Sequence, residues 1–471
     1  MTNVKYLVPT ALAAALALAG CAGVAQPPKQ DLPTAQSETT SPLVDEWWRN
    51  FNDPTLTTLV EEALAHNANV LTAAQNVTQS ESALREATVA LLPQVGLNGA
   101  VERQKPSQQT SLPGQTATVT IYQANVAASY EVDLWGRLWK ARDAAKAQLA
   151  ATQYAREVSR SAVAAQTAKS YFALLGLDAD VALLTQTLAT RDDALSLQKK
   201  RYAVGASGEF ELKQAEAERA AVAAQLPTTI AAQTQAEAAL SVLLGRSPRE
   251  VVEGQVQRGQ GLEALANAPE IPLSLPADLL TRRPDVELAA AQFAQADASL
   301  SEARRRFFPD ISLSGLFGAQ SLTAGSLLKS SARTWTAGAA IAQPIVGLAS
   351  IEAEVEAAKA SRNQAEIAYA QAARSAYADA KSALAAHQLT TDALTATTLR
   401  AQDESRIREL VNTRYKAGTA SYLDLINAER DRLAAERDHV DALRDRVTAL
   451  VSVYQALGGG WQPVALNDRM K

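Results

Sequence analysis

Cysteine and histidine are scarce in this chain of 471 residues. The one cysteine, Cys21, cannot form an internal disulfide. The three histidines, His66, His387 and His439, fall on separate predicted helices without the spacing of metal ligands. The sequence contains neither a glycine-rich phosphate loop nor a nucleophile elbow. Carboxylates are plentiful but belong to charged helix faces such as residues 429–432. The sequence therefore predicts no catalytic residue, no metal site and no enzyme.

Aromatic residues and an excess of one charge are lacking as well. Aromatics make up 5% of the chain and apolar residues 47%, and many of the apolar positions are alanine. Alanine has the highest helix propensity, so this composition suits long, closely packed helices better than a bulky globular core. The net charge is −5, from 45 basic and 50 acidic residues, which disfavours nucleic acid as a partner.

A long apolar run occurs only at the N-terminus. Residues 1–20 carry one charge, Lys5, and an apolar stretch that is typical of a secretory signal peptide. The stretch ends in Leu18-Ala19-Gly20-Cys21, which resembles a bacterial lipobox. The resemblance implies cleavage before Cys21 and a covalent lipid on it, with no other cofactor, and Ala22 in the next position implies transport to the outer membrane. Removal of Lys5 takes the net charge from −5 to −6. The alternative is a buried or stray cysteine after an ordinary signal.

The rest of the chain divides into two copies of one plan. Residues 21–52, largely rich in Pro, Gln, Ser and Thr, are predicted to form an extended tether. Residues 53–246 form the first repeat and residues 277–458 the second. An irregular connector rich in Gly, Pro and Gln, residues 247–276, joins them, and residues 459–471 form a C-terminal tail.

The clearest repeated feature is a helical hairpin tip. Arg201-Tyr202-Ala203-Val204-Gly205 returns 213 positions later as Arg414-Tyr415-Lys416-Ala417-Gly418. Each glycine can adopt the left-handed conformation that ends a helix, and a new helix follows it. We therefore expect tips near residues 203–208 and 416–421. In the second copy, Ser421 and Asp424 have the spacing of a capping box.

Each repeat also contains two segments of alternating polarity, which predict β-strands. The predicted strands cover about residues 93–104, 117–134, 309–319 and 333–344. Each is apolar on one face, as in Val95, Leu97 and Val101. The opposite faces are polar and suit water: Gln94, Asn98, Gln123, Asn125, Ser129, Ser312 and Ser314.

Two helices are unusually long. The helical patterns from residue 136 to 202 and from 347 to 417 contain no proline, and each spans about 100 Å at 1.5 Å per residue. We expect that such helices have no hydrophobic core of their own, so that other helices must pack along their sides to stabilise them. Small residues permit close approach of neighbours: Ala144, Ala147, Ala151, Ala155, Ala162, Ala353, Ala357, Ala360 and Ala368.

The strands are about long enough to cross a bilayer when tilted, but four strands cannot close. An open edge in lipid would leave unpaired backbone groups, each costing several kcal/mol. Two chains would give a filled eight-stranded barrel, and three would give twelve strands with room for a passage. We therefore predict a mainly α fold with a small β part, in which three copies share one barrel and the long helices form a tube wall below it. The alternative is a soluble protein with half-buried strands on a helical base.

Five motifs occur together in this chain: the lipobox, the paired Arg-Tyr-x-x-Gly tips, Arg282-Arg283-Pro284-Asp285-Val286, Phe308-Pro309-Asp310-Ile311, and residues 130–136 with the sequence Tyr-Glu-Val-Asp-Leu-Trp-Gly. Together they resemble one family, the outer-membrane factors of the TolC, OprM and NodT type, and the resemblance covers nearly all of the mature chain. It implies a homotrimer with a twelve-stranded outer-membrane β-barrel that is continued by a long periplasmic α-helical barrel. It also implies outer-membrane lipid around the trimer, a periplasmic adaptor and an inner-membrane pump of the RND type. It places the connector and the tail in an equatorial belt around the helices, and it implies passive conduction of exported substrates.

The resemblance also implies roles for residues at the tips. Asp424 falls on a position whose acidic side chains ring the closed pore, and Asn427 falls on a second such position that is often acidic. Glu211 is the counterpart of Asp424 in the first copy. Tyr415 matches a position that holds the tip shut. The tip residues expected to meet the adaptor are Gly205 and Gly418, with Arg201, Tyr202 and Arg414 beside them. The alternative function is a structural or adhesive envelope coiled-coil lipoprotein without channel activity, and the transported substrate stays open.

Overall fold

The computed structural model describes residues 46–105, 107, 109, 117–266 and 283–460. The signal peptide, Cys21, Arg282 and parts of the predicted tether, connector and tail lie outside these described residues. The chain divides into two compact units. The strand unit consists of Val77–Thr152 and Leu288–Ala370, and the hairpin unit consists of the other described residues.

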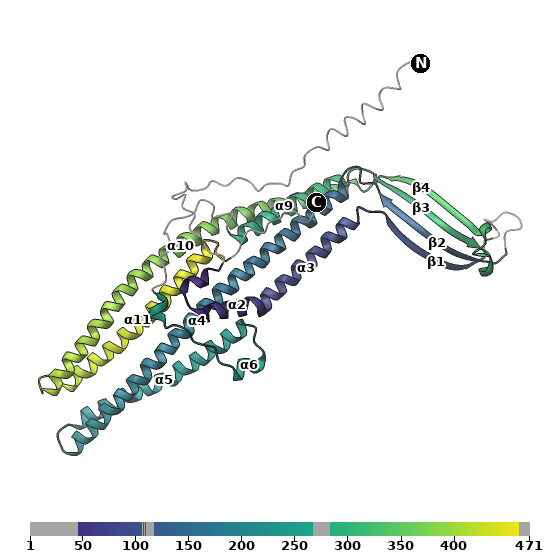
Figure 1. The fold of residues 1–471 in the computed structure, drawn as a ribbon. Helices are drawn as coiled ribbons and strands as arrows, with labels where there is room; N and C mark the ends of the chain where they lie inside the picture. The colour runs from purple at the N-terminus through teal and green to yellow at the C-terminus, as the bar shows by residue number, and fades with distance from the viewer. Residues whose placement is uncertain (1–45, 106, 108, 110–116, 267–282, 461–471) are drawn as a thin grey trace, which may run out of the picture. The chain divides into compact units, whose positions relative to one another are not determined.

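The strand unit contains a four-stranded antiparallel sheet in the order β1-β2-β3-β4, which is drawn as a curved ribbon in Figure 1. The strands are β1 (Gln94–Gln104), β2 (Val119–Glu131), β3 (Asp310–Ser321) and β4 (Arg333–Ala342). Two short 3-10 helices, η2 (Ala324–Ser326) and η3 (Ser330–Ala332), lie between β3 and β4. The structure thus has a strand in each of the four predicted stretches, and β1 and β4 form the two edges of the sheet.

The second strand ends earlier than residue 134, where the alternation placed its end. It ends at Glu131, and Asp133 turns to the following helix instead. The carboxylate of Asp133 accepts a hydrogen bond from the backbone N–H of Trp139 at 2.9 Å, which satisfies one free donor at the start of that helix. The helix-capping bond therefore outweighs the alternating pattern here.

The register of the sheet places the apolar side chains on one face. Leu97 pairs with Val126, Val126 with Phe317, and Phe317 with Trp335, in one row across all four strands. Leu97 is 82% exposed and Trp335 74% exposed, although both are large and apolar. The predicted two-faced strands are confirmed, and their apolar face is uncovered in the single chain.

Polar and small residues form the other face of the sheet. Asn98 pairs with Asn125, and Ser129 pairs with Ser314. Because side chains alternate along a strand, this face carries amides and hydroxyls where the first face carries large apolar groups.

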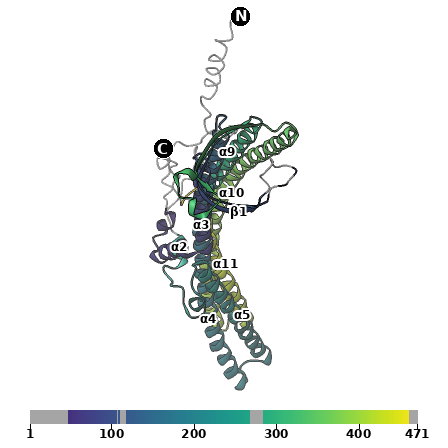
Figure 2. The same ribbon diagram turned by 90° about the vertical axis from the view of Figure 1, so that its right-hand side faces the viewer.

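Seven helices of more than ten residues lie in the described part of the chain (Figures 1 and 2). They are α2 (Pro54–His66), α3 (Ala68–Val89), α4 (Arg137–Ala203), α5 (Glu209–Leu243), α9 (Pro284–Arg305), α10 (Leu348–Lys416) and α11 (Tyr422–Ala456). The two longest predicted helices are confirmed, since α4 has 67 residues and α10 has 69. By length and composition alone, α4 is the one described helix apolar enough to cross a membrane, and a single such helix is weak evidence of a span.

The hairpin unit has a hydrophobic core, so the expectation that these helices lack one is wrong. Trp47, Tyr171, Phe172 and Leu174 are fully buried in it. Aromatic residues are few, but several of them pack together in this core: the Trp47 ring stacks on Tyr454 with centroids 5.5 Å apart. A fully buried large apolar side chain such as Phe172 stabilises the fold by about 1.5–3 kcal/mol.

The extended tether predicted for residues 21–52 is wrong at its C-terminal end. Trp47–Phe51 form the 3-10 helix η1, and Trp47, Trp48 and Phe51 are all buried. These three side chains are large and apolar, so their burial removes apolar surface from water. The sequence does not predict this burial because a segment of five residues is too short to show a helical or alternating period.

The connector predicted as irregular contains two short helices in its described part, α6 (Pro248–Glu253) and α7 (Leu262–Ala266). Ser247 and Glu250 form a complete capping box at the start of α6, with Pro248 in the first turn. Arg258, between the two helices, donates to Asp178 on α4 at 3.0 Å and to Glu237 on α5 at 2.5 Å. These ion pairs attach the connector to the first hairpin.

Candidate functional site

The two hairpin tips have the same backbone geometry. Gly205 has a φ of 71° and Gly418 a φ of 75°, the left-handed region that favours glycine. The N–H of Ala206 donates to the carbonyl of Arg201 at 2.8 Å, and the N–H of Thr419 donates to the carbonyl of Arg414 at 2.9 Å. These are the bonds of a Schellman motif, which ends α4 and α10. The predicted helix ends are confirmed, and both tips are visible in Figure 1.

A Cβ atom at either tip glycine would meet no atom within 4 Å. Glycine is therefore required at these positions by the backbone angle and not by lack of space. Neither tip is covered by another described part of the chain.

The second tip starts α11 with the predicted capping box. The Ser421 hydroxyl accepts from the backbone N–H of Asp424 at 3.1 Å, and the Asp424 carboxylate accepts from the backbone N–H and the hydroxyl of Ser421, each at 2.8 Å. These bonds hold the pKa of the Asp424 carboxyl below its usual value, because they stabilise the charged form. Asp424 is exposed, so its charge faces solvent in the single chain.

The first tip differs at this point. Gly208 occupies the N-cap of α5 and has no side chain to cap the helix. Glu211 is three residues on, in the position equivalent to Asp424, and a Cβ at Gly208 would lie 2.8 Å from its Oε2 atom. The two acidic residues therefore occupy equivalent places, but only Asp424 belongs to a complete capping box.

Tyr415 joins the two hairpins near their tips. Its hydroxyl accepts from the Arg201 guanidinium at 2.5 Å and from the Gln198 amide at 3.1 Å, both from α4. The Arg201 Cζ atom also lies 5.4 Å from the centroid of the Tyr415 ring. Ser207 in turn donates to the Gln198 carbonyl oxygen at 3.2 Å. We call these four residues the tip tie.

The remaining predicted tip residues are not brought into this tie. Tyr202 is 45% exposed, and Arg414 and Asn427 are also exposed.

Farther from the tips lies a group of charges that sequence reasoning missed. Arg191 on α4 is 4% exposed and pairs with Glu429 on α11 and, at 3.9 Å, with Glu218 on α5. Arg408 on α10 pairs with Glu429 at 3.1 Å, and Arg430 pairs with Glu218. We call these five residues the charge layer. Glu429 belongs to the charged helix face interpreted at residues 429–432, and the structure shows that this member of the face is buried.

Nothing short-range in the sequence signals the charge layer. Arg191 and Glu429 are 238 positions apart, and each stands in a segment rich in other charges. The available signal is the helical register: Glu429 lies three residues after the buried Ile426 and so on the same face of α11.

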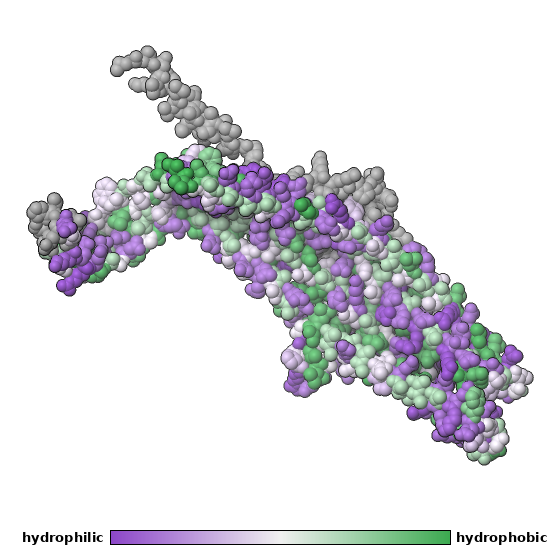
Figure 3. All heavy atoms as spheres, turned by 180° about the vertical axis from the view of Figure 1, so that it is seen from behind, coloured by the Kyte–Doolittle hydropathy of each residue, from purple (hydrophilic) through white to green (hydrophobic). Residues whose placement is uncertain are grey.

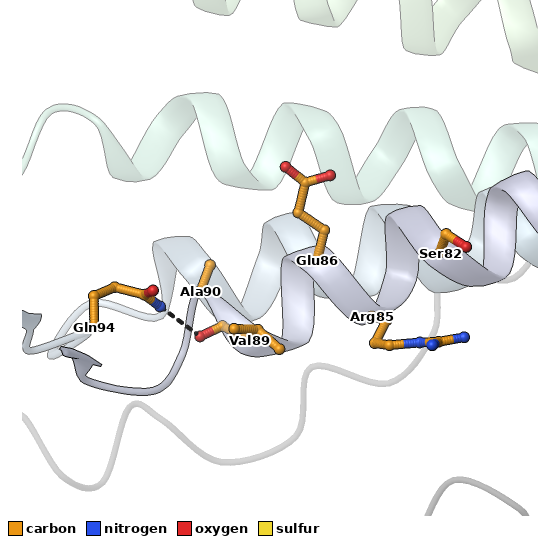
Figure 4. A pocket seen from close by; sticks show the side chains of 6 residues that line it. All are labelled: Ser82, Arg85, Glu86, Val89, Ala90 and Gln94. Carbon is orange, nitrogen blue, oxygen red and sulfur yellow. Dashed lines mark hydrogen bonds between the residues drawn. The ribbon is translucent and has the colours of Figure 1, made fainter. Parts of the chain in front are cut away.

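A surface depression of about 410 Å³ lies in the strand unit, at the end of α3 (Figure 4). The Gln94 amide donates to the Val89 carbonyl there at 3.2 Å and so satisfies one free acceptor at the end of the helix. Arg85 and Glu86 point to opposite sides of α3. Since no nucleophile or paired acid and base converges on it, this depression is a helix-end feature. The described residues also contain no cluster of His, Cys, Asp or Glu suited to a metal ion.

The family profile described as outer membrane efflux protein matches residues 59–246 and 275–459. The pyoverdine export outer membrane protein OpmQ of Pseudomonas putida is 29% identical, covering 93% of each chain. The cation efflux system protein CusC of Escherichia coli is 28% identical, covering 95% of this chain and 97% of that protein. The crystal structure of the Campylobacter jejuni CmeC outer membrane channel superposes with a TM-score of 0.87 at 25% identity, covering 93% and 96% of the two chains.

Proposed function

This chain belongs to the outer membrane efflux protein family, and from that premise we propose that three copies of it form the outer-membrane exit duct of a tripartite efflux or secretion system. The observation that carries the proposal is the sheet of the strand unit. It has a row of large exposed apolar side chains on one face, polar residues on the other, and two edges without a partner strand.

Three copies remove the two edges. In the hydrocarbon core of a bilayer, unpaired N–H and C=O groups cost several kcal/mol each, so spanning sheets must close. The edge strand β4 of one copy would pair with β1 of the next, which gives a barrel of about twelve strands. The row from Leu97 to Trp335 would then face lipid, and Asn98, Asn125, Ser129 and Ser314 would face the aqueous interior.

The proposed anchor is a lipid on Cys21, which would hold each copy at the inner surface of the outer membrane while its helices extend into the periplasm. The test is mass spectrometry of the purified protein. We expect cleavage before Cys21 and acyl chains on it, and we expect no acyl chain in Cys21→Ser. An unmodified Cys21 in the wild-type protein contradicts the anchor and leaves the channel proposal standing.

The proposed gate lies at the hairpin tips. In a trimer, three Asp424 carboxylates near the symmetry axis would attract cations and repel one another. Asn427 cannot supply a second acidic ring, so one ring is proposed, with Glu211 as the counterpart of Asp424 at the first tip. The tip tie at Tyr415 would keep the hairpins of each copy together in the closed state.

The proposed partners meet the outer surface of the tips. Gly205, Gly418, Arg201, Tyr202 and Arg414 would contact a periplasmic adaptor, which would connect the duct to an inner-membrane pump of the RND type. In the isolated chain the exposure of both tip loops supports this assignment.

Conductance of the purified protein in a planar lipid bilayer tests the function. We expect single channels with a cation preference. Asp424→Asn removes the charge but keeps an oxygen that can accept from the N–H of Ser421, so we expect intact trimers, a higher conductance and a weaker cation preference. An unchanged conductance and preference would remove Asp424 from the gate. A protein that forms no channels at all would favour the envelope coiled coil.

We propose no single cargo for the duct. Relatives at 29% and 28% identity are named for pyoverdine export and for cation efflux. A wide polar passage need not bind its cargo tightly, so the pump would choose the substrate. A deletion strain tested against dyes, antibiotics and metal ions would identify the class that this chain exports.

A further inference from the structure

We infer that the charge layer is the fixed joint of the gate: the two hairpins of one chain separate from the tips as far as Arg191 and stay together beyond it. This inference rests on the proposed gating function. It assigns Arg191, Glu218 and Glu429 as positioning residues, which act on the tip tie through the helices that carry it.

The charge layer contacts all four helices of the two hairpins. Arg191 comes from α4, Glu218 from α5, Arg408 from α10, and Glu429 and Arg430 from α11. Each carboxylate is shared by two arginines, one of which is Arg191 in both cases. Two of these pairs run from one hairpin to the other, Arg191 with Glu429 and Arg430 with Glu218, and separation of the hairpins at this level would break both.

Burial makes these contacts hard to break. Arg191 is 4% exposed, Glu218 7% and Glu429 9%. A buried charge that loses its partner is left without either water or a counter-ion, which is strongly unfavourable. The Nε atoms of Arg191 and Arg408 are already buried without a hydrogen-bond partner, so neither guanidinium has surplus contacts to lose.

The tip tie has the opposite character. Its central bonds run from a guanidinium and an amide to the neutral hydroxyl of Tyr415, next to exposed loop residues. Water can replace such bonds at little net cost in free energy. Opening should thus break the tie first and stop at the charge layer.

The distance between the two sets of contacts defines the moving part. Arg191 precedes Gly205 by 14 positions, and Glu429 follows Gly418 by 11. At 1.5 Å per residue, the segments that separate are about 16–21 Å long.

A reference contact exists on the other side of the charge layer. Arg437 on α11 donates to Asp180 on α4 at 3.3 Å, and both residues lie farther from the tips than the layer does. If the joint is at the charge layer, these two positions keep their distance when the gate opens.

The experiment compares two cysteine pairs in the full-length trimer. The pair on the tip side is Arg201→Cys with Tyr415→Cys, and the pair on the far side is Asp180→Cys with Arg437→Cys. Each is treated with a short bismaleimide, and the controls are the unreacted variant and the variant treated with N-ethylmaleimide. The readout is planar-bilayer conductance of the same preparation.

We expect the tip-side cross-link to lower conductance at least tenfold and the far-side cross-link to change it less than twofold. If the tip-side cross-link has no effect, the gate proposal fails and this inference fails with it. If both cross-links block the channel, the gate stands but the joint is not at the charge layer.

The variant Arg191→Met tests whether Arg191 sets the position of the joint or only contributes to packing. Without Arg191, the moving part should extend past the layer, so that the far-side cross-link now blocks a channel that it left open before. If the far-side cross-link still has no effect in an assembled Arg191→Met trimer, Arg191 does not position the gate.

Discussion

A single carboxylate can serve both the start of a helix and the charge of a pore. Asp424 accepts from the backbone N–H and the hydroxyl of Ser421, and these local bonds alone explain why the residue is acidic. They also keep the side chain charged and fixed in direction. Any role of Asp424 in ion selection therefore depends on a geometry that the capping box supplies.

The pH dependence of the channel follows from this arrangement. The folded-state pKa of Asp424 is held below its ordinary value of 3.8, so the carboxyl stays charged at every pH above that value and its contribution is lost only as pH falls through the lowered pKa. Repulsion among three copies would act in the opposite direction. We expect the capping bonds to prevail and the reversal potential in a KCl gradient to stay constant from pH 7 to about pH 5. A cation preference that declines within this range would mean that repulsion prevails in the trimer.

Arg191 and Arg430 form a matched pair for measuring the charge layer. The Arg191 side chain is 5% exposed and that of Arg430 is 60% exposed, yet both pair with Glu218. We expect Arg191→Met to lower the free energy of unfolding by about 3–5 kcal/mol, because it leaves buried carboxylates short of a partner. Arg430→Met removes a partner from Glu218 alone and leaves Arg191 beside it, so it should cost less than Arg191→Met, which removes a partner from both Glu218 and Glu429. Denaturant unfolding in detergent measures both, and equal losses would contradict the importance of burial.

Among the elements, the sheet has the clearest separation of apolar and polar residues, which lie on opposite faces. Its register places Leu97 in the apolar row and Asn98, the next residue, on the polar face. The large exposed side chains of this sheet contrast with the surface shown in Figure 3, where hydrophobic and hydrophilic residues are interspersed over the helices. In the proposed barrel, the alternation along one strand would therefore decide which side meets lipid.

Neighbouring substitutions on β1 test this division. Leu97→Arg places a charge in the row proposed to face lipid and should destabilise the barrel by about 2–4 kcal/mol if it lies near the middle of the bilayer. Asn98→Arg places the same charge in the proposed aqueous interior and should leave stability nearly unchanged while altering ion preference. Urea unfolding of the protein in lipid vesicles gives the comparison. A reversed order of the two losses would mean that the faces are assigned wrongly.

The sequence predicts those elements whose signals are local or periodic. The four strands follow from alternation, the ends of α4 and α10 from Gly205 and Gly418, and the start of α11 from Ser421 with Asp424. Short elements such as η1 and α6 escape because five or six residues contain too few periods to recognise. The charge layer escapes because its partners are distant in the chain, and a charged residue gives no sign of its burial until the partners are known.

On the scale of the whole molecule, the core and the sheet have different requirements. The hairpin unit buries Trp47, Tyr171 and Phe172 within one chain and so has a core of its own. Within the described residues, the sheet leaves its apolar row exposed and its edges unpaired. The helical part can thus be stable before assembly, whereas the barrel proposed here can exist only in the trimer.

The open edges of β1 and β4 have a genetic consequence. If each barrel is built from three chains, a chain whose strands cannot pair inactivates every trimer that contains it. The normal chains in that trimer then lose their function as well. When normal and defective chains are made in equal amounts and mix freely, about one barrel in eight is free of the defect. Alleles damaged in the strands should therefore be dominant over the wild type, and alleles that stop synthesis should be recessive. Drug or metal resistance of cells that carry both alleles would distinguish the two classes.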